Sequence, residues 1–264
     1  MLHINNLSVG YHKPILSELS FAPVAGQLTV LLGTNGSGKS TLMKTLAGLI
    51  PPLSGTIMLD SHNLQQLLPQ QLAKKISVLP QMRQVPEMTV EQFVTLGRFP
   101  HRGYFSPLTL ADKQHIAQSI EQCGLGAFTK RYITTLSGGE RQRAYVALCL
   151  AQDTDIILLD EPTTFLDIRH QYEVLELLRQ LCTQGKTLVM VLHDLALALD
   201  YSNSILLLHE GHLLSNSSPA ELLSSNNLER VFGVQTHTLE KAGKNYYTFS
   251  CAIGVSANSE PVIA

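Results

Sequence analysis

Near its start the chain reads Leu31-Leu32-Gly33-Thr34-Asn35-Gly36-Ser37-Gly38-Lys39-Ser40-Thr41, between an apolar run and a segment with helical periodicity. Gly33, Gly38, Lys39 and Ser40 satisfy G-x-x-x-x-G-K-[ST], a strand-to-helix loop whose backbone N–H groups converge on phosphate oxygens. The positive end of the helix dipole favours the same anion. The loop therefore predicts nucleotide binding, with Lys39 reaching the β- and γ-phosphates and the Ser40 hydroxyl binding Mg²⁺.

Length and composition describe a globular chain. Its 264 residues can bury a sizeable core and allow one large domain or two small ones. Hydrophobic residues make up 44% and charged residues 15%, as in folded proteins. The net charge is −2, from 19 basic and 21 acidic residues without a Lys/Arg block. This balance argues against a nucleic-acid-binding surface.

Cysteine spacing and the absence of targeting patterns indicate the compartment. Cys123, Cys149, Cys182 and Cys251 form no C-x-x-C pair, so we expect buried free thiols in a reducing compartment. The longest apolar candidate for a membrane span, 188–199, is interrupted by a His-Asp pair. The first residues do not resemble a signal peptide. We therefore expect the protein to stay in the cytoplasm.

Apolar runs alternate with amphipathic segments along most of the chain. Strands are expected at 2–9 (a sheet edge), before the turn 20–26, and at 28–32, 56–60, 76–80, 156–159, 187–192, 205–208 and 212–214. Helices are expected at 42–47, 90–97, 109–124, 140–151 and 171–182, and a last one opens at Pro219. This alternation predicts an α/β fold with an N-terminal antiparallel β layer and a parallel sheet covered on both faces.

We expect one domain over 1–240. Within it, the spacing of apolar residues between 82 and 151 is helical, which predicts a helical subdomain inserted into the nucleotide-binding fold. The segment 241–264 is a polar tail for which the sequence predicts no element and no role.

The acidic pair Asp160-Glu161 follows an apolar strand. In a phosphate-loop fold, a carboxylate at this position holds Mg²⁺, and we assign that role to Asp160. Glu161 points elsewhere along the rim and could polarise an attacking water as the general base of phosphoanhydride hydrolysis. The plainer alternative, a solvated turn, is less favoured because a phosphate loop lies upstream.

Leu136-Ser137-Gly138-Gly139-Glu140 opens another helix and forms a second anion-binding surface, without a lysine. One nucleotide cannot easily lie against two such helix starts of one compact chain. We therefore expect each half-site to be completed by another subunit.

At this point the sequence resembles the ATP-binding cassette (ABC) ATPase family. The phosphate loop, the LSGG-type signature and the Asp-Glu strand occur in the order typical of that family, over nearly all of the chain. The resemblance implies the P-loop NTPase fold of ABC ATPases, ATP hydrolysis, and ATP and Mg²⁺ as cofactors. It also implies a homodimer in which the signature contacts the γ-phosphate of ATP bound to the opposite protomer.

The resemblance further assigns roles to single residues. Gln81 matches the glutamine that contacts Mg²⁺ and the attacking water and links the site to a transport partner; alone, it could be an ordinary loop residue. His193 matches the switch histidine at the γ-phosphate, although a lone strand-end histidine is often structural. Asp167 matches the loop aspartate of the dimer interface. Tyr11 matches the aromatic residue stacked on adenine, with a surface tyrosine as the alternative.

The predicted site therefore has three sets of residues. The catalytic residues are Glu161, His193 and Gln81, and the metal-binding residues are Ser40, Gln81 and Asp160. The nucleotide-binding residues are Tyr11, Gly33, Thr34, Asn35, Gly36, Ser37, Gly38, Lys39, Ser40, Thr41, Ser137, Gly138, Gly139 and Asp167.

Two segments indicate a branch of the family. They are Leu96-Gly97-Arg98-Phe99-Pro100-His101-Arg102 and Glu161-Pro162-Thr163-Thr164-Phe165-Leu166-Asp167-Ile168-Arg169-His170-Gln171. Both look like ATPases of importers for iron–siderophore complexes, haem and cobalamin, and the second is most similar to the siderophore branch. The chain departs from the family at Glu140, where many members carry Gln, and at Ser217, where Gly is usual. It also departs in the tail from Lys244.

The resemblance implies a peripheral ATPase subunit at the cytoplasmic face of the membrane. As a homodimer it would drive membrane permease subunits, fed by an extracytoplasmic substrate-binding protein, to import a ferric siderophore. Haem, cobalamin or another metal chelate would leave the same hydrolytic site, because the ATPase does not touch the cargo. The alternative of another class is a soluble ABC ATPase acting on DNA or ribosomes, which usually joins two cassettes or inserts coiled coils or basic segments. A P-loop kinase would leave the signature unexplained.

Overall fold

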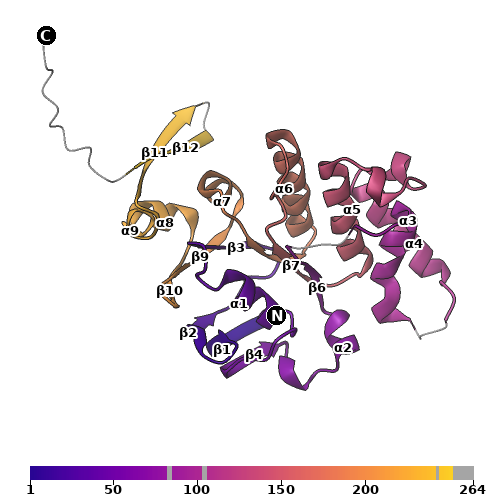
Figure 1. Cartoon of the computed structure of the whole chain (residues 1–264), viewed down its shortest axis with the longest axis horizontal. Helices are drawn as coiled ribbons and strands as arrows, with labels where there is room; N and C mark the ends of the chain where they lie inside the picture. The colour runs from indigo at the N-terminus through magenta and orange to yellow at the C-terminus, as the bar shows by residue number, and fades with distance from the viewer. Residues whose placement is uncertain (82–84, 103–105, 242–243, 252–264) are drawn as a thin grey trace, which may run out of the picture.

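The computed structural model describes residues 1–81, 85–102, 106–241 and 244–251, and its strands form three sheets (Figure 1). The strands are β1 (Leu2–Gly10), β2 (Pro14–Phe21), β3 (Leu28–Gly33), β4 (Ser54–Leu59), β5 (His62–Asn63), β6 (Ile76–Leu79), β7 (Ile156–Asp160), β8 (Thr187–Val191), β9 (Ser204–His209), β10 (His212–Ser217), β11 (Val234–Lys241) and β12 (Lys244–Cys251). The helices are α1 (Lys39–Leu46), α2 (Pro69–Ala73), α3 (Val90–Thr95), α4 (Leu110–Gln122), α5 (Gly138–Ala151), α6 (Ile168–Thr183), α7 (Leu195–Tyr201), α8 (Pro219–Ser224) and α9 (Asn227–Phe232). Short 3₁₀ turns are η1 (Leu64–Gln66), η2 (Leu96–His101), η3 (Gly126–Phe128) and η4 (Ile133–Thr135).

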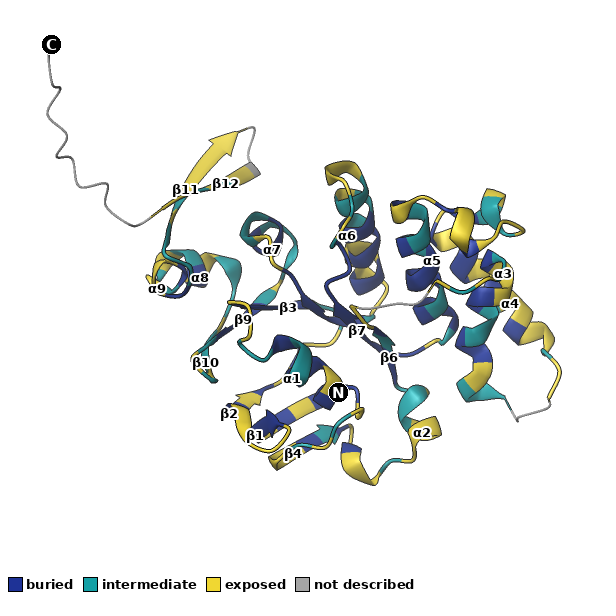
Figure 2. Ribbon diagram, viewed as in Figure 1, coloured by how far each residue is buried: buried dark blue, intermediate teal, exposed yellow. Residues whose placement is uncertain are grey.

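A six-stranded sheet in the order β10-β9-β3-β8-β7-β6 forms the centre of the fold. Its neighbouring strands from β9 to β6 pair in parallel, and β10 pairs antiparallel with β9. Side chains alternate between the two faces: in β7, Ile157 and Leu159 join one apolar cluster, and Ile156 and Leu158 join the other. Figure 2 shows β3 and β7 of this sheet in the dark blue of buried residues. The predicted parallel sheet with two covered faces is confirmed.

The two faces of the central sheet are covered by different layers (Figure 1). Leu42 and Leu46 of α1 pack with the antiparallel sheet on one face, and Val174 of α6 and Leu197 of α7 pack on the other. The antiparallel sheet has the order β2-β1-β4-β5, so β1 is an inner strand. The predicted edge position of this strand is wrong. Register shifts with both neighbours make its apolar alternation irregular, which resembled an edge pattern.

Helices α3, α4 and α5 follow one another between β6 and β7. They start at the side-chain N-caps Thr89, Thr109 and Ser137. These caps satisfy backbone donors that would otherwise lack partners at the helix starts. Helices therefore occupy the segment where a helical subdomain is expected, while the bounds 82–151 and 1–240 stay predictions.

A buried ion pair ties the turn η2 to the helices of this segment. Arg98 Nε donates to Asp112 Oδ1 at 2.8 Å, with both side chains under a tenth exposed, and Arg98 Nη1 donates to the Ala151 carbonyl oxygen at 2.8 Å. The guanidinium also lies at the carboxyl end of α5, where a cation complements the helix dipole.

The last part of the chain holds more structure than its sequence pattern predicts. The expected β9–β10 hairpin turns through Glu210 and Gly211, whose φ angles are 47° and 81°. The helix that opens at Pro219 is followed by α9, so it is not the last helix. The predicted polar tail contributes β12, which pairs with β11, and its half-buried Tyr247 and Phe249 pack against the central core.

The cysteine prediction holds for three of the four thiols. Cys123, Cys149 and Cys182 are buried and belong to no disulfide, whereas Cys251 is exposed. Burial raises the pKa of the Cys182 thiol to about 11. Within the described ranges, no helix has both the length and the hydropathy needed to cross a bilayer.

Candidate nucleotide site

The glycine-rich loop lies at the carboxyl end of a central strand, between β3 and α1. Gly36 and Gly38 have φ angles of 80° and 95°, left-handed values that favour glycine. A Cβ on Gly33 would lie 2.7 Å from the Leu208 carbonyl oxygen, so this position also requires glycine. No side chain caps the start of α1, and its first turn carries no acidic residue. The free N–H groups of this turn are therefore available to an anion.

Lys39 is buried inside this loop. Its Nζ donates to the carbonyl oxygens of Gly33 at 2.8 Å and Thr34 at 2.9 Å. Burial lowers the pKa of Lys39, and the nearby carboxylates of Glu161 and Asp160 oppose that shift. A buried ammonium held by neutral carbonyls is well suited to pair with an incoming phosphate.

The rest of the loop is more open. The exposed residues are Thr34, Asn35 and Gly36, and the half-buried ones are Ser37, Gly38, Ser40 and Thr41. The tip of the loop is thus accessible to a ligand, while Gly33 and Lys39 at its two ends are buried.

A small set of oxygen donors lies beside α1. Ser40 Oγ and Asp160 Oδ1 are 3.4 Å apart, and both residues line a cavity of about 220 Å³ together with Gln81. Burial raises the pKa of Asp160, partly opposed by the hydrogen bond from Ser40. Hydroxyl, carboxylate and amide oxygens suit Mg²⁺. Among the described residues, no group of three His, Cys, Asp or Glu side chains could hold a metal ion. The three oxygen donors of Ser40, Asp160 and Gln81 suit an ion that also binds phosphate oxygens.

Glu161, His193 and Gln81 meet next to this cavity. Glu161 Oε1 lies 2.6 Å from Nε2 of His193, Oε2 accepts from the Thr164 hydroxyl at 3.0 Å, and Gln81 also hydrogen-bonds the carboxylate. Burial raises the pKa of Glu161, but these three hydrogen bonds outweigh it and hold that pKa below its ordinary value. The carboxylate is therefore ionised at neutral pH, as a general base must be.

The signature residues form a capped helix start. Glu140 Oε2 accepts from the Ser137 N–H at 2.8 Å, and Ser137 Oγ accepts from the Glu140 N–H at 3.3 Å. A carboxylate closes this capping box as well as an amide would, which accounts for the departure at Glu140. No hydrogen bond between described residues connects Ser137, Gly138 or Gly139 with the phosphate loop, and α1 and α5 lie apart (Figure 1). One chain thus keeps its two anion-binding helix starts separate.

Two further predicted residues lie at the surface. Asp167 is the N-cap of α6, and its Oδ1 accepts from the His170 N–H at 2.9 Å. Tyr11, 57% exposed, follows β1. Neither has a hydrogen bond with the phosphate loop among the described residues. Within one chain, the structure therefore gathers the predicted catalytic and metal-binding residues and leaves the signature, Asp167 and Tyr11 outside that group.

Sequence reasoning missed three side chains that support predicted site residues or the loop beside them. Thr164 bonds the Glu161 carboxylate, His170 packs against Gly139, and Gln171 Nε2 donates to the Leu166 carbonyl oxygen at 3.2 Å. All three lie in the second branch-specific segment quoted above, so a signal was present. Spacing alone could not show what they contact.

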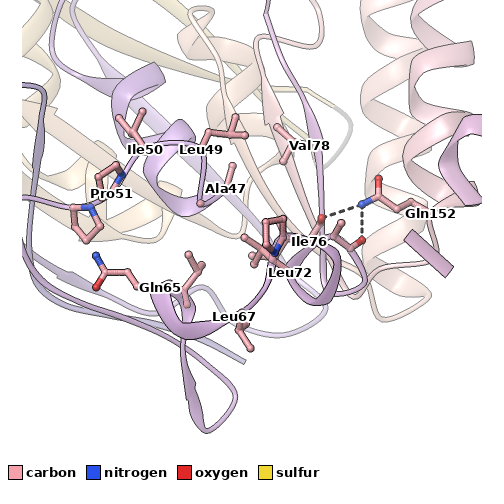
Figure 3. Close-up of a pocket in the computed structure, with 15 residues that line it drawn as sticks. Ala47, Leu49, Ile50, Pro51, Gln65, Leu67, Leu72, Ile76, Val78 and Gln152 are labelled. Atoms are coloured by element: carbon pink, nitrogen blue, oxygen red, sulfur yellow. Dashed lines mark hydrogen bonds between the residues drawn. The ribbon is translucent and has the colours of Figure 1, made fainter. Parts of the chain in front are cut away.

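An apolar groove of about 510 Å³ adjoins the cavity (Figure 3). Gln152 closes one side, where its Nε2 donates to the carbonyl oxygens of Ala73 at 2.6 Å and Ile76 at 3.1 Å. Leu49 and Val78 line both the groove and the smaller cavity beside α1. The two hollows therefore share a wall.

A phosphate loop after β3, with an ionised glutamate directly after β7 of the same parallel sheet, defines a P-loop nucleoside triphosphatase. A family model described as ABC transporter matches residues 16–164, more than half of the sequence, so the chain belongs to the ABC transporter family. It is an ABC ATPase in fold and in class of activity, as its motifs predict.

Relatives with known names are similar over most of their length. The achromobactin transport ATP-binding protein of Dickeya dadantii (strain 3937) is 41% identical over 231 residues, 86% of each chain. The ferric enterobactin transport ATP-binding protein of Escherichia coli (strain K12) is 38% identical over 232 residues, 87% of this chain and 86% of the relative. The hemin import ATP-binding protein of Rhodococcus jostii (strain RHA1) is 41% identical over 229 residues, 86% of this chain and 78% of the relative.

Solved structures show the same likeness. An inward-facing, putative metal-chelate type ABC transporter superposes with a TM-score of 0.83 at 29% identity, over 94% of this chain and 96% of that chain. A dimeric ATP-binding cassette in a post-hydrolysis state, bound to ADP and Pi, superposes with a TM-score of 0.72 at 27% identity, over 83% and 99% of the two chains.

Proposed function

We propose that this chain is the ATP-hydrolysing subunit of a membrane importer for ferric siderophores. The relatives named for achromobactin and ferric enterobactin transport support this cargo, as does the likeness to a metal-chelate type transporter. Hemin is a second candidate, because the Rhodococcus relative is 41% identical, the same value as for the Dickeya relative. The observation that carries the proposal is the wall that the catalytic cavity shares with the apolar groove, since it offers a route from ATP hydrolysis to a membrane partner.

Ser40, Asp160 and Gln81 would hold Mg²⁺, with phosphate oxygens as the remaining ligands. When bound, the ion neutralises charge that develops on the phosphates during hydrolysis. Lys39 would exchange its carbonyl partners for phosphate oxygens of ATP. Residues 33–41 would wrap these phosphates with backbone N–H groups.

Glu161 would act as the general base. Its ionised carboxylate would take a proton from water while the water oxygen attacks the γ-phosphorus, and the bond between that phosphorus and the β–γ bridging oxygen breaks, leaving ADP. His193, 2.6 Å from this carboxylate, would orient it and reach the γ-phosphate. Gln81, which also bonds Glu161, would position the water.

Two copies of the chain would close on two ATP molecules. Ser137, Gly138 and Gly139 of one copy would face the γ-phosphate held by the loop of the other, with Asp167 beside them at the interface. The separation of the two helix starts within one chain supports this arrangement, as does the dimeric relative bound to ADP and Pi. Tyr11 would stack on adenine, which its exposed position allows.

The permease would place a segment in the groove of Figure 3. The groove is predominantly apolar, and Leu49 on its rim is 67% exposed, so an apolar segment would bury surface there. The ATPase would then lie peripherally at the cytoplasmic face of the membrane. An extracytoplasmic binding protein would deliver the cargo on the other side.

Reconstitution tests this proposal. The chain is assembled in lipid vesicles with the permease and binding protein encoded by neighbouring genes, and ATP turnover is measured with and without chelate. We expect stimulation by the ferric siderophore that the binding protein carries, and none by hemin or cobalamin. Stimulation by hemin alone would identify hemin, the second candidate, as the transported cargo. A complex that no chelate stimulates would contradict the importer function.

A further inference from the structure

His170 joins the start of α5 to the loop before α6. Its Nδ1 lies 2.7 Å from Asp167 Oδ1, and since a carboxylate only accepts, Nδ1 carries the proton. The opposite edge of the ring packs on Gly139, where a Cβ would lie 2.2 Å from Cδ2 of the imidazole. The ring is therefore fixed by a hydrogen bond on one edge and by backbone contact on the other.

Neighbouring contacts reinforce this arrangement. Gln171 Nε2 donates to the Leu166 carbonyl oxygen at 3.2 Å, which holds the loop before α6 to that helix. A Cβ on Gly138 of α5 would lie 3.6 Å from Leu166 Cδ2, so the start of α5 lies against the same loop. Further along the helices, Arg143 of α5 pairs with Glu173 of α6 at 2.8 Å. The amino-terminal half of α5 is thus joined to α6 and its preceding loop at these two points as well as through His170.

The loop that His170 holds is exposed and strained. Phe165 is 98% exposed, and its φ of 64° is a left-handed value that costs a residue with a side chain energy. Such a backbone persists only when the surrounding structure holds it. The bonds to Asp167 and Leu166 supply that support on the carboxyl side, and the bond between Thr164 and Glu161 supplies it on the amino side.

We propose that His170 is a positioning residue of the ATP site that two copies form. Its ring packs against Gly139, and its Nδ1–H donates to Asp167. The signature and the loop that contains Asp167 therefore present one continuous surface to the second copy. This role rests on the proposed dimer, because neither segment bonds the phosphate loop of its own chain. It also gives a physical reason for the branch-specific residues after Asp167, which touch no predicted phosphate contact.

Two substitutions separate the contacts of the imidazole. His170→Asn retains an N–H donor near the Nδ1 position but removes the ring from Gly139. His170→Phe retains a ring but removes the bond to Asp167. Each is made in the full chain carrying Glu161→Gln, which should hold ATP without hydrolysing it. His212→Asn, an exposed position at the start of β10, serves as the matched control.

Sedimentation in the presence of ATP measures dimer formation, and a fluorescent ATP analogue measures binding to the monomer. We expect His170→Phe to weaken the ATP-driven dimer about fivefold, the factor that one net hydrogen bond contributes to an equilibrium. His170→Asn should weaken it as well, because the ring no longer packs against Gly139. Analogue binding should stay within about twofold of the parent, because His170 does not touch the phosphate loop. His212→Asn should match the parent in both measurements.

Several results would overturn this role. If the parent dimerises with ATP and both His170 variants dimerise equally well, the positioning role fails and the proposed dimer stands. If the variants lose analogue binding in step with dimerisation, His170 is only structural. If the parent stays monomeric with ATP, the proposed dimer fails, and the role of His170 fails with it.

Discussion

Replacing Glu161 by Gln tests the hydrolytic site most directly. The amide has the same size as the carboxylate, and its oxygen can still accept one of the hydrogen bonds from His193 and Thr164, which are 2.6 and 3.0 Å long. The change therefore removes the proton acceptor and leaves the local packing in place. A positioned general base contributes about 10²–10⁴-fold to a rate. We expect turnover to fall by that factor, which corresponds to a barrier about 3–5 kcal/mol higher.

ATP binding should survive this substitution. Glu161 affects the phosphate loop only through its charge, which favours the protonated form of Lys39, and the phosphates of ATP replace that charge. Single-turnover phosphate release and equilibrium binding of a fluorescent ATP analogue measure the two properties separately. The matched control is Glu176→Gln on α6, a partly exposed residue paired with Arg179 at 3.2 Å, which should leave both unchanged. Turnover reduced by less than about tenfold would refute Glu161 as the base.

Three other perturbations address binding, core electrostatics and acid stability. Lys39→Ala should abolish detectable analogue binding, since it removes the cation that the loop holds; retained affinity would contradict the assigned role. Arg98→Met should lower the free energy of unfolding by about 3–5 kcal/mol in denaturant titrations, because Asp112 becomes a buried unpaired carboxylate, and an unchanged midpoint would disprove this. Hydrogen bonds from Lys75 and the N-terminal amine lower the pKa of Asp60 from 3.8 to about 2, so its stabilising contribution is complete well above pH 3.8 and is lost as the pH falls toward 2. Solvent exposure keeps that contribution below about 1 kcal/mol, and Asp60→Asn should flatten the pH dependence of unfolding in this window.

Local patterns predicted most of the central fold and its site. The run 156–159 is apolar at every position because β7 is buried on both faces. The acidic pair after it therefore had to lie at the carboxyl end of this strand, where the sheet ends. Long-range pairing was not predictable in the same way. Whether β1 is an inner or an edge strand depends on β4, whose partner residues lie about fifty positions away. In β12, the half-buried Tyr247 and Phe249 alternate with exposed residues, a signal that the neighbouring Tyr246 and the polar residues around them obscured.

Contacts between distant segments explain why the other supporting residues could not be predicted from the sequence. The capping box at Ser137 is visible in the sequence because its partner is three residues away. The contact between Gly139 and His170 has no such signature, because it depends on how two helices pack. Spacing therefore predicts which residues touch the nucleotide, and the structure was needed to find the side chains that support them.

Leu49 and Val78 belong to two hollows at once, and this has an evolutionary consequence. A larger or smaller side chain at either position, selected to match a changed permease, would also reshape the chamber beside Asp160. Compensating mutations for a poor fit should therefore arise in the permease or on the far wall of the groove, around Leu67 and Leu72, where no such conflict exists. Adaptation to new membrane partners would in this way leave the hydrolytic chemistry unchanged.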